Sequence, residues 1–145
     1  MASSYTVSWE GFFGGPEKSE TIEITYAITT HTDGEITAIS TDTDKIADGR
    51  TYTDLIKGRS FRMIEVFRTV GGTAPDAADV TVKDSDGLDL LNGNGVNLIH
   101  ASSTLAQYPL IDDLGSTIAV RGALSIDIAN QTTNTAHITI RLIFE

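Results

Sequence analysis

The sequence predicts an all-β fold, an antiparallel β-sandwich or a β-barrel of the jelly-roll kind, with little helix and long ordered loops. Apolar and polar residues alternate along several short stretches, which is the period of a β-strand. Gly, Asn and Pro separate these stretches, as turns between strands require. Periodicity does not distinguish a sandwich from a barrel, so both architectures remain open at this point.

The last stretch, residues 117–144, carries the clearest strand signal. Apolar residues fall at every second position on both sides of a polar link of Asn, Gln and Thr. They are Leu124, Ile126 and Ile128 before the link, and Ile138, Ile140, Leu142 and Phe144 after it. Each arm can therefore place one apolar face on a core. Because the link cannot extend either face, the pattern predicts a β-hairpin with one solvated side.

The N-terminal region predicts a strand followed by an aromatic loop. Residues 4–10 alternate, and their shared apolar face consists of Tyr5, Val7 and Trp9. In segment 11–16, glycines and a proline break regular structure, yet the segment contains Phe12 and Phe13. The two rings either fold back onto the core or form an aromatic tip that inserts into a neighbouring subunit.

Residues 20–41 predict a second hairpin. The first strand, residues 20–30, has one apolar face made of Ile22, Ile24, Tyr26 and Ile28. Asp33-Gly34 is a tight-turn signal, and residues 35–41 form a shorter, less regular strand after it.

The middle of the chain predicts less regular structure. Residues 53–58 can hold one helical turn closed by glycine. Residues 60–70 are apolar on both faces, as expected for a strand inside a sandwich or at a subunit contact. The expected faces are Phe61, Met63 and Phe67 on one side, and Ile64, Val66 and Val70 on the other. Residues 79–84 predict a short strand, and residues 87–116 a long ordered excursion across one edge of a sheet.

Composition limits the function classes. The 145 residues predict a single domain, residues 1–145, with residues 1–19 as a candidate N-terminal arm. The net charge of −10, without a basic run, argues against nucleic acid and anionic membranes as partners. No stretch approaches the roughly 18–20 apolar residues that span a bilayer, and no secretory signal is visible at the start. The chain has no cysteine, which excludes disulfides and thiolate chemistry.

Metal-binding and catalytic motifs are absent from the sequence. The run Asp84–Asp89 places glycine fourth instead of sixth, so it fails as an EF-hand and predicts an Asp-Gly turn; a calcium site of another kind remains open. His31, His100 and His137 lack ligand spacing. No serine lies in a nucleophile elbow, and no P-loop occurs. We therefore expect no catalytic residue, no metal and no cofactor, and a protein that is not an enzyme.

The C-terminal pattern resembles a known group of proteins. Residues 120–130, the Thr/Asn link and residues 136–144 resemble the ending of small β-rich virion structural proteins of tailed bacteriophages, and the Asp86–Gly95 run upstream looks like the same group. The resemblance covers about the last 60 residues and carries no catalytic signature. It implies a capsid decoration (cement) protein, bound as a homotrimer to the major capsid protein, and located in the virion after assembly in the host cytoplasm.

Two alternatives stay beside this interpretation. One is a β-domain of a tail or baseplate. The other is a carbohydrate-binding module, for which Trp9, Tyr52 or Tyr108 on a flat sheet face would be the platform. For an interface with other subunits the sequence points to Trp9, Phe12, Phe13 and Tyr108.

Overall fold

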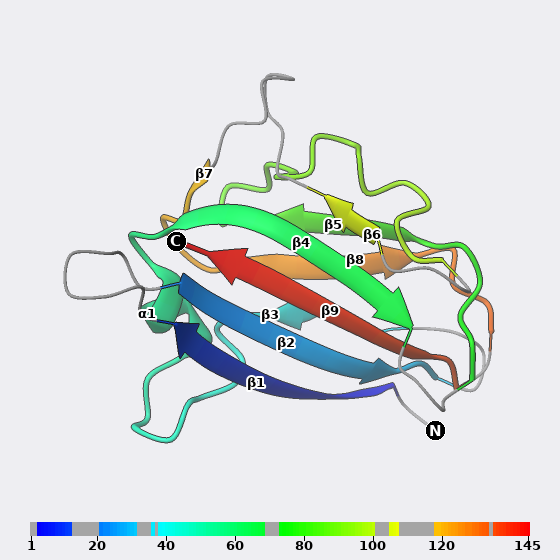
Figure 1. Cartoon of the computed structure of the whole chain (residues 1–145), viewed down its shortest axis with the longest axis horizontal. Helices are drawn as coiled ribbons and strands as arrows, with labels where there is room; N and C mark the ends of the chain where they lie inside the picture. The colour runs from blue at the N-terminus through cyan, green and yellow to red at the C-terminus, as the bar shows by residue number, and fades with distance from the viewer. Residues whose placement is uncertain are drawn as a thin grey trace.

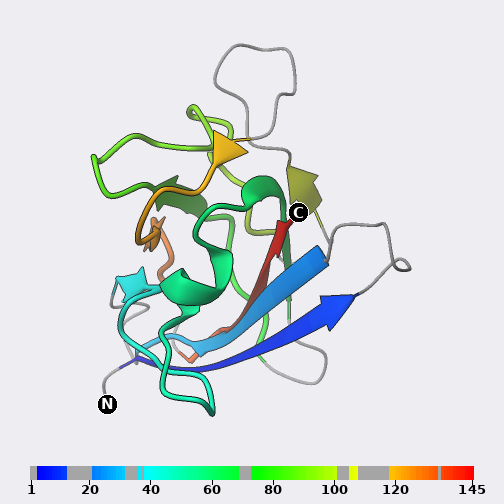
Figure 2. The same cartoon turned by 90° about the vertical axis from the view of Figure 1, so that its left-hand side faces the viewer.

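The fold is a β-sandwich of two antiparallel sheets (Figures 1 and 2). The computed structural model describes residues 3–12, 21–31, 36, 38–68, 73–100, 105–107, 118–133 and 135–145. The prediction of an all-β fold with little helix is confirmed, and the two sheets make it a sandwich and not a closed barrel.

The larger sheet lies toward the viewer in Figure 1 and has the strand order β1-β2-β9-β4-β6, with β7 also paired to β4. Its strands are β1 (Ser4–Phe12), β2 (Thr21–Thr29), β4 (Ser60–Arg68), β6 (Leu105–Gln107), β7 (Ile118–Ala119) and β9 (His137–Phe144). The smaller sheet, behind it, has the order β3-β8-β5. Its strands are β3 (Ile39–Ser40), β5 (Asp79–Lys83) and β8 (Ser125–Ala129).

The core fills the space between the two sheets. The predicted apolar faces supply it: Ile22, Ile24, Tyr26 and Ile28 from β2, and Ile138, Ile140, Leu142 and Phe144 from β9. Phe61 and Phe144 contact each other with ring centroids 5.3 Å apart. From the smaller sheet, Val80, Val82 and Ile126 face the same core.

The predicted C-terminal hairpin is wrong in its pairing. β8 belongs to the smaller sheet, whereas β9 pairs with β2 and β4 in the larger one. Both edges of β9 are therefore occupied, and no place beside it is left for β8. Alternation fixes which face of a strand meets the core, but two such strands can meet one core from opposite sheets.

The predicted hairpin over residues 20–41 is also wrong. β2 pairs with β1 on one side and β9 on the other, in an unbroken register from Ser4 opposite Thr29 to Phe12 opposite Thr21. β3 pairs with β8 in the other sheet. β2 and β3 thus lie in different sheets and do not pair with each other, while Asp33 and Gly34 of the predicted turn lie outside the described residues.

Strand β4 confirms the expected strand over residues 60–68 but corrects the faces, and Val70 lies outside the described residues. The register shifts between Phe61 and Met63, which is a β-bulge. The extra residue turns Phe61 to the core together with Ile64 and Val66, while Met63 and Phe67 are half-buried on the other side. A strict period of two assigned Phe61 to the wrong face because it cannot anticipate a bulge.

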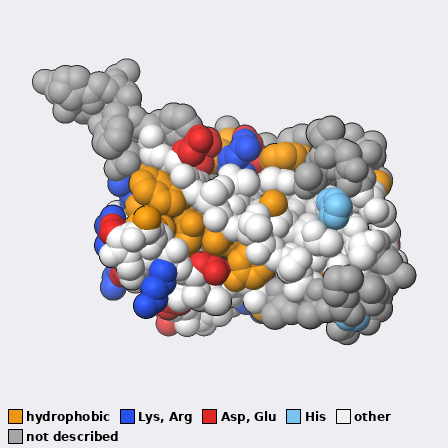
Figure 3. Space-filling view, turned by 90° about the horizontal axis from the view of Figure 1, so that it is seen from below, with side chains coloured by type: hydrophobic (Ala, Val, Ile, Leu, Met, Phe, Trp, Pro, Cys, Tyr) orange, Lys and Arg blue, Asp and Glu red, His pale blue; other side chains and the backbone are white. Residues whose placement is uncertain are grey.

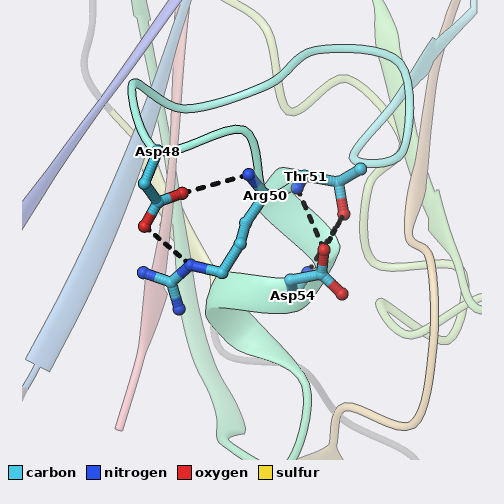
Figure 4. A network of polar contacts seen from close by, with 4 residues as sticks. All are labelled: Asp48, Arg50, Thr51 and Asp54. Atoms are coloured by element: carbon cyan, nitrogen blue, oxygen red, sulfur yellow. Dashed lines mark hydrogen bonds and ion pairs between the residues drawn. The ribbon is translucent and has the colours of Figure 1, made fainter.

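The helical turn predicted at residues 53–58 is confirmed as α1 (Tyr52–Ile56), which lies at one end of the sandwich (Figure 2). Thr51 caps it: the Thr51 Oγ1 accepts from the Asp54 amide at 3.2 Å, and the Asp54 carboxylate accepts from the Thr51 amide at 3.0 Å (Figure 4). Gly58 follows with a φ of +86°, a conformation that glycine adopts without steric cost.

The described part of the long excursion, residues 87–100, runs along the free side of β5. The Val80 amide donates to the Gly95 carbonyl at 2.8 Å, and the Leu90 amide to the Val82 carbonyl at 2.7 Å. The loop approaches so closely that a Cβ on Gly95 would lie 1.7 Å from the Val80 carbonyl oxygen. The predicted path across a sheet edge is confirmed for these residues, and Gly95 is the residue that permits it.

Asp76 holds the link by which the chain passes from β8 to β9. Its carboxylate accepts hydrogen bonds from the hydroxyls and the amides of both Thr132 and Thr133. Burial alone would raise the pKa of Asp76, but these hydrogen bonds outweigh it and lower the pKa from 3.8 to about 2. The charged form of Asp76 is therefore bound more tightly in the folded chain than in the unfolded one.

We predict that Asp76→Asn lowers the free energy of unfolding at pH 7 by about 1–3 kcal/mol, the range for lost hydrogen bonds to a charged group. Because the folded pKa lies below the unfolded value, the stabilisation is complete above about pH 4 and disappears as the pH falls toward 2. Urea unfolding from pH 7 to pH 2 measures it. A stability difference between the two proteins that stays constant over this range would contradict the assignment.

Candidate functional site

The four residues that the sequence proposed for an interface are not brought together by the described structure. Trp9 lies on β1, opposite Ile24 of β2, and 38% of its surface is exposed. Phe12 is the last residue of β1. Phe13 and Tyr108 lie outside the described residues. Trp9 is therefore the one of the four whose side chain can be placed.

Trp9 belongs to an apolar row along the outermost strand of the larger sheet. Tyr5 and Val7 stand on the same, core-facing side of β1, opposite Ile28 and Tyr26 of β2. Both remain half-buried, because β1 has a strand neighbour on one side and none on the other among the described residues. Figure 3, which views the molecule from below Figure 1, where β1 lies, shows hydrophobic side chains reaching the surface with some acidic and basic side chains beside them. We call Tyr5, Val7 and Trp9 the β1 row.

Tyrosine hydroxyls connect the β1 row to α1 and to the segment before it. The Tyr5 hydroxyl donates to Asp44 at 2.6 Å, and the Tyr52 hydroxyl donates to the Val7 carbonyl at 3.4 Å. Burial, followed by the contact with Asp44, raises the pKa of Tyr5 to about 12, so this hydroxyl stays a donor at neutral pH. Tyr5 also packs edge-on against Tyr26, with centroids 5.8 Å apart. These rings have structural partners.

The carbohydrate platform proposed from sequence loses one of its rings. Tyr52 is 5% exposed and its hydroxyl is directed into the protein, so it cannot stack on a sugar. Trp9 is on the core-facing side of its strand and Tyr108 lies outside the described residues. The described residues thus do not form the flat aromatic face that such a module needs.

Arg141 is the centre of the outer face of the larger sheet. Its Nη1 donates to Glu65 on β4 at 3.0 Å, and its Nε donates to Thr25 on β2 at 3.4 Å. A second carboxylate, Glu23, lies 4.0 Å from Nε, and the guanidinium stacks 5.4 Å from the Phe67 ring centroid. One side chain thus joins three neighbouring strands. Arg141 alternates in the sequence with the apolar residues Ile140 and Leu142, which indicates the polar face, but only the strand register reveals its partners.

A concavity of about 330 Å³ opens where the turn after β5 meets the segment around β7. Its apolar lining includes Leu90, Val120 and the 49% exposed Leu88, and its charged lining includes Asp86 and Arg121. No separate sequence pattern indicates this concavity, because its two walls are about 30 positions apart in the chain. The exposed leucine in an otherwise acidic turn is the one local signal.

The acidic turn beside this concavity is built as predicted. The Asp84 carboxylate accepts from the amides of Asp86 and Leu88, both at 2.9 Å, and Gly87 has a φ of +86°. Asp89 likewise accepts from the amide of Gly93 at 2.8 Å. These aspartates close turns, which confirms the prediction of an Asp-Gly turn.

Over the described residues, no three His, Asp or Glu side chains converge as they would around a metal ion. Within the same ranges, no helix has the length and apolar character needed to traverse a lipid bilayer.

We predict that Arg141→Ala lowers the free energy of unfolding by about 1–2 kcal/mol, because it leaves Glu65 and Glu23 unpaired on a half-buried face. The matched control is Arg62→Ala, which breaks an ion pair of the same 2.9–3.0 Å length with Glu145 at a more exposed position. Arg62→Ala should lower the free energy of unfolding by less than about 1 kcal/mol. Urea titrations of the three proteins give the values; equal losses would refute the central role of Arg141.

Comparison with known proteins finds a similarity to a solved structure. No protein-family model matches the sequence, and no curated protein matches it. Among solved structures, the chain is similar to a chain of the cyanophage Pam1 capsid asymmetric unit, with a TM-score of 0.43 and 12% sequence identity. The alignment covers 98% of this chain and 83% of that chain.

Proposed function

We propose that this protein is a non-enzymatic structural component of a tailed-phage virion, which decorates the capsid and stabilises it by binding its outer surface as an oligomer. Its partners are other copies of the same chain, as a homotrimer by the resemblance, and the major capsid protein. It joins the particle during assembly in the host cytoplasm. The resemblance of residues 86–144 to small virion proteins supports this function.

The observation that carries the proposal is the pair of apolar surfaces on an acidic body. One is the β1 row with the exposed Trp9. The other is the concavity beside Leu88, at the start of the Asp86–Gly95 run that carries part of the resemblance. Exposed apolar surface rimmed by polar groups marks protein contacts, and a net charge of −10 keeps such a protein soluble before it binds.

We assign the concavity to the contact with the capsid protein. One hydrophobic side chain of the partner can fill this concavity and pack on its apolar lining. Asp86 and Arg121, which also line it, can make polar contacts with the partner. A tail or baseplate β-domain would use the same kind of contact, and the location of the chain in the particle separates the two roles.

We predict that Leu88→Ser weakens binding to capsid shells by about tenfold, the effect of removing a central apolar contact. The control is Val96→Ser, which changes a more exposed apolar residue, at 63%, that does not line the concavity and should bind normally. Shells of the major capsid protein from the phage that the proposal requires to encode this chain are mixed with each variant and sedimented. Failure of the unchanged protein to sediment with shells would refute the capsid role. Equal binding of both variants would refute the assigned surface.

A further inference from the structure

The described sheet edges are protected unequally. Along β5, the loop over residues 89–99 supplies backbone hydrogen bonds to Val80, Val82 and Ala78. At the opposite edge of that sheet, β3 has two residues. Strand β1, in contrast, extends over nine residues at the border of the larger sheet and pairs with β2 alone. Of the edges within the described ranges, β1 is the long one to which no further strand or backbone segment is bonded; side chains alone reach it, through the Tyr52 hydroxyl at the Val7 carbonyl and the Tyr5 hydroxyl at Asp44.

β1 also lacks the features that normally prevent edge-to-edge pairing. Such strands usually carry lysine, proline, a bulge or an inward charge. Residues 4–12 contain no lysine, arginine or proline, and their one charged residue is Glu10. Their register with β2 is continuous over all nine pairs. A strand this regular can serve as a template for another strand.

The sequence of β1 is complementary to itself. We propose that β1 pairs antiparallel with β1 of a second copy of this chain, about a twofold axis at Val7. Tyr5 then faces Trp9 of the second copy, and Val7 faces its counterpart. Of the registers that keep core-facing residues on one side, this is the one that sets all three members of the β1 row against one another. It covers the exposed part of Trp9.

On the outer face, the same register brings small hydroxyl residues together. Thr6 lies opposite Ser8 of the second copy, and Ser4 lies opposite Glu10. The two Glu10 carboxylates are therefore never directly opposed, which would cost stability. Both copies carry a net charge of −10, so their overall repulsion should make pairing stronger as added salt shortens the screening length, which is about 8 Å at 0.15 M.

A twofold contact of this kind is isologous and closes after two copies. It does not build a threefold ring, so in the proposed homotrimer it would connect protomers of neighbouring trimers. The inference is independent of the capsid role, because it concerns the protein alone in solution.

The test places charges on the exposed outer face at positions 6 and 8, away from the core. Thr6→Lys/Ser8→Lys sets lysine against lysine across the twofold axis. Thr6→Lys/Ser8→Glu sets lysine against glutamate twice. Side chains directly opposite each other on neighbouring strands are close enough for their charges to interact. The dissociation constant of the doubly lysine-substituted protein should therefore exceed that of the lysine–glutamate protein by about tenfold or more. Sedimentation equilibrium measures both.

If only the net charge of each copy mattered, the order of the two dissociation constants would be reversed. The two lysines reduce the net negative charge and hence the repulsion between copies, whereas the lysine–glutamate pair leaves it at −10. The proposal requires the unchanged protein to associate in even-numbered particles that the two lysines split in half. It is overturned if the unchanged protein stays monomeric or odd-numbered at all concentrations and salt levels, or if the two variants associate equally. Circular dichroism of both variants confirms that each is folded.

Discussion

The structure depends on the burial of β9 at the centre of the larger sheet. Ile138, Ile140, Leu142 and Phe144 are completely buried, and each contributes about 1.5–3 kcal/mol by leaving water. Because β2 and β4 occupy both edges of β9, the preceding strand β8 must join the opposite sheet. The chain therefore crosses between the layers after β8 and before β9, and Asp76 fixes that crossing through Thr132 and Thr133. The two-layer architecture follows from this one arrangement.

The sequence predicted which side of each strand faces the core better than it predicted which strands pair with each other. Alternation identified the core sides of β2, β8 and β9, because the position of a side chain on a strand is a local property. Pairing is not local: strands with the same period can share a sheet or face each other across a core. Both predicted hairpins were wrong for this reason. At the bulge next to Phe61 even the predicted face of the strand was wrong, since one extra residue reverses the alternation beyond it.

The candidate surfaces differ in the same way: the sequence predicts what is local to one segment, but not what joins distant segments. Trp9 could be proposed from sequence because a tryptophan in an N-terminal alternating stretch is a common contact residue, and the structure places it half-exposed at a sheet edge. The concavity at Leu88 and the Arg141 network could not be proposed, because each joins segments far apart in the chain. The topology also explains why β1 is open to a further strand: the loop over residues 89–99 makes backbone hydrogen bonds to β5, whereas β1 has backbone partners only in β2 among the described residues.

We propose that this protein acts through contact surfaces, with one apolar patch for a shell and one strand edge for a second copy. The proposed function requires a phage genome to encode the chain, and electron cryomicroscopy of that phage's virion tests this most directly. We expect two-layer β-domains on the outside of the shell, with the Leu88 concavity against the capsid protein and β1 against another copy. Density for the chain inside the tail, or virions that lack the chain altogether, would contradict it.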